Sequence, residues 1–145
     1  MKFFLTLLLL TSFMSISDGQ ITDFQWKSRI LILSAADETM QRLLVSEKPS
    51  LEERDLKIFI LTGNATEHQR PSPELAKKLI THLALAPETP MICLIGKDGV
   101  TTLKWAPEAF TFQKLYASID AMPMRQLEIK RSAIQPLQQP QKPAS

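Results

Sequence analysis

Few residues of this chain have a type and a spacing that could support catalysis. The single cysteine, Cys93, can form no internal disulfide and has no second thiol with which to exchange one. It lies inside an apolar run, so we expect a small buried side chain, with a peroxide-reactive or intermolecular thiol as the alternative. The two histidines, His68 and His82, have no cysteine or carboxylate at metal-site spacing. We therefore expect no metal and no other cofactor.

The segment Gly96-Lys97-Asp98-Gly99 could be read as a phosphate-binding loop, but its context argues against this reading. A phosphate loop is followed by a helix, whereas a strand pattern follows here. Asp-Gly is typical of a tight hairpin turn, in which positive φ angles are needed. We expect Lys97 to belong to such a turn, between an apolar strand after Pro90 and a return strand from Val100 to about Trp105.

Hydrophobic patterns predict the elements that position these residues. Residues 29–34 and 55–61 are apolar runs typical of strands, and Lys57 places the second run nearer a sheet edge. Capping residues predict three helix starts, at Asp37, Ser72 and Thr111. The second helix should bury four side chains on one face: Leu75, Leu79, Ile80 and Leu83. Before the first strand, we expect Phe24 and Trp26 to form a lid over the sheet edge, with ligand stacking as the alternative.

The resulting order of elements is β-α-β-α-β-β-α. Two right-handed crossovers followed by a hairpin and a closing helix would produce it. A four-stranded mixed sheet in the order 2-1-3-4, with helices on both faces, satisfies this order. The sequence therefore predicts an α/β protein with the three-layer arrangement of thioredoxin-like folds.

Thioredoxin-like folds carry their chemistry where the first strand meets the first helix, opposite a cis-proline that leads into the third strand. In this chain the first position is residues 34–37, which contain no cysteine, and the second is Pro90 after Thr89. Redox exchange at this position is excluded, because no thiolate is present to attack a disulfide. The candidate residues of this vestigial site are Ser34, Asp37, Thr89 and Pro90, with Arg29 or Arg125 as a further polar group.

The N-terminus has the three-part layout of a secretory signal. Met1-Lys2 is basic, residues 3–14 are almost entirely apolar, and residues 15–17 are suitable for a peptidase. The apolar run is too short for the roughly 20 residues of a membrane span. We expect a signal peptide of residues 1–17, with cleavage as late as residue 19, and a secreted or periplasmic protein without a transmembrane segment. A retained anchor helix is the alternative.

The remaining chain should form one domain, residues 23–131, followed by a disordered Pro- and Gln-rich tail, residues 132–145. Removing Lys2 from the 17 basic residues leaves one more than the 15 acidic residues, so we expect no nucleic-acid partner. The basic segment Arg125 to Arg131 is expected to be a solvated helix end, with contact to anionic glycans or lipid headgroups as the alternative.

Four segments resemble one protein family. They are residues 24–29 (FQWKSR), 53–56 (ERDL), 94–99 (LIGKDG) and 119–125 (IDAMPMR). Together they resemble the domain of unknown function 4174, and the resemblance covers residues 23 to 131. Related domains occur in secreted bacterial proteins and in the sushi-repeat matrix proteins of animals. The resemblance implies a thioredoxin or peroxiredoxin relative, and it brings no established activity and no catalytic residues.

These observations favour a non-catalytic binding or adhesion module outside the cytoplasm, with an unknown protein or an extracellular or periplasmic ligand as its partner. The alternative is an enzyme or a small-anion-binding protein at the vestigial site near residues 34–37 and Pro90. Helix N-termini attract anions, but Asp37 as the capping residue would itself occupy that positive end. The chain therefore fits the binding module better.

Overall fold

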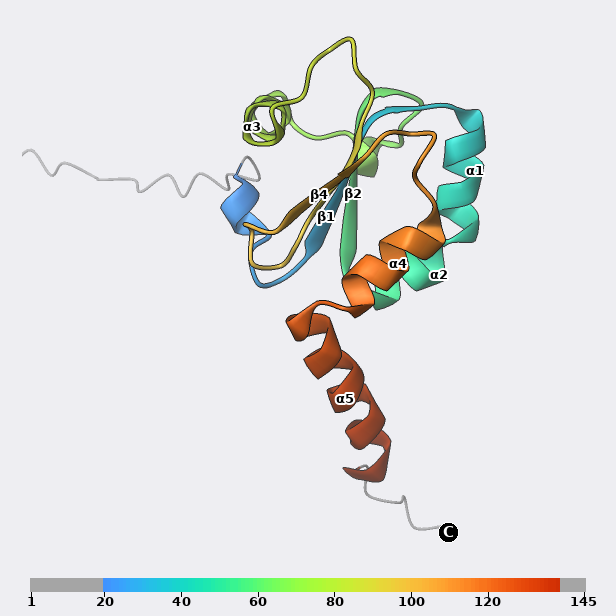
Figure 1. The fold of residues 1–145 in the computed structure, drawn as a ribbon, viewed down its shortest axis with the longest axis vertical. Coiled ribbons are helices and arrows are strands. Elements are labelled where there is room, and N and C mark those ends of the chain that lie inside the picture. The colour runs from blue at the N-terminus through green and yellow to red at the C-terminus, as the bar shows by residue number, and fades with distance from the viewer. Residues whose placement is uncertain (1–19, 139–145) are drawn as a thin grey trace, which may run out of the picture.

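The computed structural model describes residues 20–138 (Figure 1). The predicted signal peptide and residues 139–145 of the predicted tail lie outside the described residues. In chain order, the elements are η1 (Ile21–Asp23), β1 (Arg29–Ala36), α1 (Glu38–Ser46), α2 (Lys48–Glu53), β2 (Leu56–Gly63), η2 (Glu67–Gln69), α3 (Pro73–Leu83), β3 (Ile92–Ile95), β4 (Thr102–Trp105), α4 (Phe112–Asp120) and α5 (Pro123–Gln138).

The four strands form one sheet in the order β2-β1-β3-β4. Strands β1 and β2 are parallel, whereas β3 is antiparallel to both β1 and β4. The predicted α/β class and strand order are confirmed, and β2 is an edge strand as expected. The prediction of two right-handed crossovers is wrong for the second connection, because β3 runs antiparallel to β2 and a crossover joins parallel strands. After α3, residues 84–91 bring the chain to the carboxyl end of β1, where Ser34 N–H donates to the Met91 carbonyl, so β3 starts where β1 finishes.

Helices cover both faces of the sheet, which explains why β1 has no polar alternation. On one face, Leu31 and Leu33 pack in a core with residues of α1, α2 and α4. On the other face, Ile30 and Ile32 pack with α3. Figure 1 shows α3 on one side of the sheet and α1, α2 and α4 on the other, while α5 projects away from the sheet. The three-layer prediction is therefore confirmed.

The predicted helix starts are confirmed by their capping hydrogen bonds. Asp37 Oδ1 accepts from Met40 N–H at 2.8 Å, and the Ser72 and Thr111 hydroxyls accept from the third residue beyond each of them. The prediction for Ile80 is wrong, because its side chain is 40% exposed while Leu75, Leu79 and Leu83 are buried. Ile80 lies 100° around the helix from Leu79, outside the face that meets the sheet.

Helix α5 is longer than the sequence predicted. Residues 132–138 continue the helix, although the sequence predicted a disordered tail from residue 132. Gln, Leu, Glu, Lys, Arg and Ala predominate between residues 126 and 133, and a helix already begun at Pro123 extends readily through such good helix formers. No helix among the described residues is long and apolar enough to cross a membrane.

Cys93 is fully buried in the core beneath α3, as the sequence predicted. Burial raises the pKa of its thiol, so both access and thiolate formation disfavour reaction. We expect a thiol reagent to label the folded protein at least about 100-fold more slowly than the denatured protein, because labelling must wait for local opening. Stopped-flow labelling with and without denaturant measures this ratio. Equal rates in the two conditions would contradict the buried assignment.

Candidate functional site

The residues of the predicted vestigial site lie at the carboxyl end of β1. The Ser34 hydroxyl donates to the Met91 carbonyl at 2.9 Å and accepts from the Met91 N–H at 2.9 Å. The Thr62 hydroxyl donates to the Ser34 carbonyl at 2.7 Å. These bonds join β1 to β2 and to the segment before β3. Ser34 therefore has a structural role in holding three segments together.

The other predicted residues do not converge with Ser34 on one pocket. A pocket of about 180 Å³ is lined by Ser34, Leu61, Thr62, Ile80, Leu85, Ala86 and Pro87. Asp37, Thr89 and Pro90 do not line it, and all three are exposed. No cis peptide bond occurs in residues 20–138, so Pro90 follows a trans bond. Within the same residues, no group of three or more potential metal-binding side chains is close enough to hold an ion.

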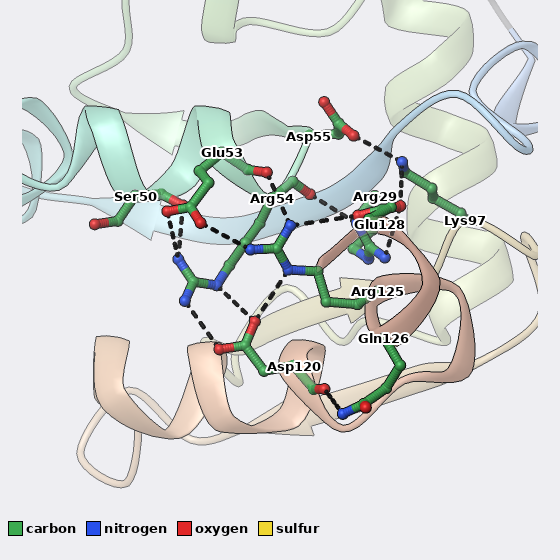
Figure 2. Close-up of polar contacts among 10 residues, drawn as sticks. All are labelled: Arg29, Ser50, Glu53, Arg54, Asp55, Lys97, Asp120, Arg125, Gln126 and Glu128. Atoms are coloured by element: carbon green, nitrogen blue, oxygen red, sulfur yellow. Dashed lines mark hydrogen bonds and ion pairs between the residues drawn. The ribbon is translucent and has the colours of Figure 1, made fainter. Parts of the chain in front are cut away.

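Charged side chains gather instead at the opposite end of the sheet (Figure 2). We call this group the ion network. It contains four cations, Arg29, Arg54, Lys97 and Arg125, and four carboxylates, Glu53, Asp55, Asp120 and Glu128. No sequence pattern predicts this network, because its members come from β1, α2, the α2–β2 and β3–β4 connections, α4 and α5. A local signal is present in Arg29, a cation at the start of a strand whose first five residues are buried.

Glu128 is at the centre of one half of the network. It receives two hydrogen bonds from the Arg29 guanidinium, at 3.2 and 3.3 Å, and one from Lys97 Nζ at 2.6 Å. Arg29 is 0% exposed and also donates to the Arg54 carbonyl at 2.9 Å. Figure 2 shows Glu128 between Arg29 and Lys97. One carboxylate thus neutralises two buried cations.

Lys97 corrects the prediction for the hairpin. The turn itself forms as expected, since Gly99 N–H donates to the Gly96 carbonyl at 3.0 Å and Gly99 has a φ of 72°. However, the Lys97 side chain turns inward, is 8% exposed, and also donates to Asp55 at 2.7 Å. The lysine is therefore an anchor between the hairpin, the α2–β2 connection and α5. The return strand begins at Thr102, two residues later than predicted.

Arg125 and Asp120 organise the other half. Arg125 donates to Asp120 at 3.1 Å and to Glu53 at 3.0 Å, and Arg54 donates twice to Asp120, at 3.1 and 2.9 Å. The prediction of a solvated helix end is therefore wrong for Arg125, which is 5% exposed, although Lys130 and Arg131 are exposed. The burial of Arg125 could not be predicted from its neighbours in sequence, because its partner Glu53 lies 72 residues earlier in the chain.

The electrostatics of the network favour fixed charges. Partial burial of Glu128 opposes its ionisation, but the hydrogen bonds from Lys97 and Arg29 outweigh this effect and lower its pKa. The hydrogen bond from Arg54, reinforced by Arg125, lowers the pKa of Asp120. A general acid or base needs a pKa near the working pH. Both carboxylates instead stay ionised at neutral pH, as structural ion-pair partners do.

Comparison with known proteins identifies the family. Residues 20–128 match the family described as a domain of unknown function, DUF4174. The chain belongs to this family. No curated relative and no solved structure matches the sequence. All eight residues of the ion network lie within the matched segment, which ends at Glu128 itself. The network is therefore part of the DUF4174 domain.

The DUF4174 domain has a second pocket directly beside the network, which we call the Trp26 pocket. Its volume is about 190 Å³, and its lining is mostly apolar. The lining residues are Trp26, Arg29, Gly96, Lys97, Asp98, Thr101, Met122, Pro123 and Met124. They come from three regions: the connection before β1 with the first residue of β1, the β3–β4 turn and the α4–α5 junction. Arg29 and Lys97 belong both to the ion network and to the pocket lining, so the network forms part of the pocket wall.

Trp26 has an unusual conformation for a large side chain. Its φ is 68°, in the left-handed region that bulky residues avoid, and its N–H donates to the Lys97 carbonyl at 2.7 Å. Its side chain is 61% exposed, so the prediction that Trp26 belongs to a lid over the sheet edge is wrong. Phe24 behaves as predicted and packs edge-on against Phe59, with ring centroids 5.5 Å apart. The DUF4174 domain thus holds an exposed indole at the rim of the pocket.

Proposed function

We propose that this chain is an exported, non-catalytic binding module that uses a thioredoxin-like scaffold without its redox site. One observation carries the proposal. The Ser34 hydroxyl is bonded in both directions to the backbone of Met91, so the polar group best placed for chemistry at the vestigial site is already occupied. The Asp37 carboxylate likewise caps α1 and covers the helix end where an anion would bind.

The partner is proposed to be a polypeptide met outside the cytoplasm. Export follows from the basic, apolar and small-residue segments at the N-terminus, with cleavage after residue 17 or as late as 19. The ion network supports a binding role, because its buried and mutually paired charges give rigidity to the surface around them. Rigid surfaces lose less conformational entropy when a partner binds.

Two measurements test this proposal. Mass spectrometry of the protein from the exported fraction should find a mature N-terminus at Asp18 or Gln20, and a protein that retains residue 1 would contradict cleavage. The immobilised mature chain should then capture a defined polypeptide from the same fraction. The control is a Ser34→Ala/Asp37→Asn variant, which should capture the same polypeptide, because the module does not act through these two residues. Loss of capture in this folded variant would favour the vestigial site, and capture no better than by an unrelated protein would contradict a binding module.

A further inference from the structure

We infer that the Trp26 pocket is the binding surface of this module, and that it takes a large apolar side chain of a partner polypeptide with a lysine or arginine beside it. This inference rests on the proposed binding function and adds the location and the chemistry of the contact. Three features of the pocket carry it: its size, its charge and the conformation of Trp26.

The size of the Trp26 pocket suits one side chain. Its volume is about 190 Å³, whereas an apolar cavity of about 150 Å³ is enough to hold benzene. A phenylalanine or leucine side chain therefore fits, and a second large group does not. The walls are the indole of Trp26 and the residues Met122, Pro123 and Met124. Tryptophan is enriched among the residues that dominate binding energies, and methionine adapts to irregular apolar surfaces.

The charge at the edge of the Trp26 pocket favours one type of partner residue beside the bound apolar side chain. The two cations in the wall are neutralised within the ion network, Arg29 by Glu128 and Lys97 by Asp55 and Glu128. Asp98 differs, because within residues 20–138 it has no cationic partner, and its carboxylate accepts only from Val100, Thr101 and the Thr101 hydroxyl. The pocket edge therefore carries one unpaired negative charge. A basic residue of the partner complements it.

The conformation of Trp26 indicates that its exposure is built into the fold. A left-handed backbone at tryptophan costs free energy, and such strain concentrates at functional positions. The hydrogen bond to the Lys97 carbonyl fixes the backbone of Trp26, and the Lys97 side chain is itself fixed by Asp55 and Glu128. The backbone of Trp26 is thus fixed at the pocket rim before any partner arrives. A free apolar molecule would miss Asp98, whereas a side chain on a polypeptide can reach Trp26 and Asp98 together.

The test selects peptides on the mature chain from a phage-displayed library of random sequences. We expect the enriched peptides to share a large apolar residue next to lysine or arginine. The variant Trp26→Gly removes the indole and relieves the backbone strain, because glycine accepts a positive φ. It should weaken the peptides about tenfold, which is typical for loss of an aromatic anchor. Asp98→Asn keeps an acceptor for the turn but should weaken binding and abolish its salt dependence.

Val45→Ala provides the matched control, because Val45 is an exposed apolar residue on α1, outside this pocket, and should have no effect. Thermal unfolding checks that each variant is folded. If the peptides bind Trp26→Gly as tightly as the native chain, the Trp26 pocket is not the binding surface, although the proposed binding function would still stand. Two results would overturn the lysine or arginine in the inference: enriched peptides with an acidic residue beside the large apolar one, or peptide affinity that is unchanged in Asp98→Asn. A library without enriched peptides would overturn the inference, whereas failure to capture any polypeptide from the exported fraction concerns the proposed function alone.

Discussion

Replacing Glu128 with glutamine should lower the free energy of unfolding by about 3 kcal/mol, which is typical when one partner of a buried ion pair is removed. The glutamine is close in shape but carries no charge, so Arg29 and Lys97, 0% and 8% exposed, lose the carboxylate that they share. Lys97 keeps the Asp55 carboxylate, whereas Arg29 keeps only neutral acceptors, which are the Arg54 carbonyl and the amide oxygen of the new glutamine. Most of the loss should therefore come from the uncompensated charge of Arg29.

Chemical denaturation of the native chain and the variant measures this difference. Glu52→Gln is the matched control, because Glu52 is an exposed helical glutamate whose partner Lys48 lies 3.7 Å away, and its replacement should change stability by at most about 0.5 kcal/mol. Equal effects of the two substitutions would contradict a stabilising role for the network.

The same substitution should also change the dependence of stability on pH. The pKa of Glu128 is lowered in the folded protein, so its contribution is complete at neutral pH and is lost as the pH falls below 4.5, its ordinary value, and through the lower folded value. Asp120 contributes in the same direction. In Glu128→Gln, the acid-induced loss of stability should be smaller than in the native chain. Denaturation curves at several pH values between neutrality and strong acid measure it.

Replacing Gly63 with alanine should be comparably destabilising, by about 3 kcal/mol, for a steric reason. Gly63 ends β2 with a φ of 87°, and a Cβ there would lie 2.3 Å from the Ala36 carbonyl oxygen. Relief of this clash must move β1 and β2 apart at the carboxyl end, where Asn64 N–H donates to that same oxygen at 2.9 Å.

Gly99→Ala separates the clash from the backbone strain. Gly99 has a similar φ of 72°, but a Cβ there would meet only the Gln25 side chain, at 3.6 Å. We expect a loss of about 1–2 kcal/mol, from the left-handed backbone alone. Denaturant unfolding should show a larger loss of stability for Gly63→Ala than for Gly99→Ala. Equal losses would contradict the clash between a Cβ at residue 63 and the Ala36 carbonyl oxygen.

Much of the fold could be predicted because it follows from local rules. The apolar run of β1 indicates burial on both faces, and the capping residues Asp37, Ser72 and Thr111 mark helix starts through bonds to residues three positions ahead. Each of these signals can be read within one turn of helix or one strand. The strand order can be predicted from the order of elements, although the crossover rule applies only to the connection from β1 to β2.

The charged end of the sheet could not be predicted in the same way. Arg29 and Glu128 are separated by 99 residues, and Arg54 and Asp120 by 66. No periodicity relates such positions, so Lys97 looked like a turn residue and Arg125 like part of a solvated surface. For the candidate site, the sequence directed attention to the carboxyl end of β1, because the thioredoxin-like comparison concerns that end. The Trp26 pocket depends on a backbone angle at Trp26 that no sequence pattern reveals.

The position of Glu128 also determines when, during synthesis, the buried cations can be neutralised. During synthesis Arg29 and Lys97 appear long before the carboxylate that they share. A chain released short of residue 128 would contain every strand of the sheet and still carry an unneutralised guanidinium within it. The carboxylate that completes this charge balance is also the last residue of the family match.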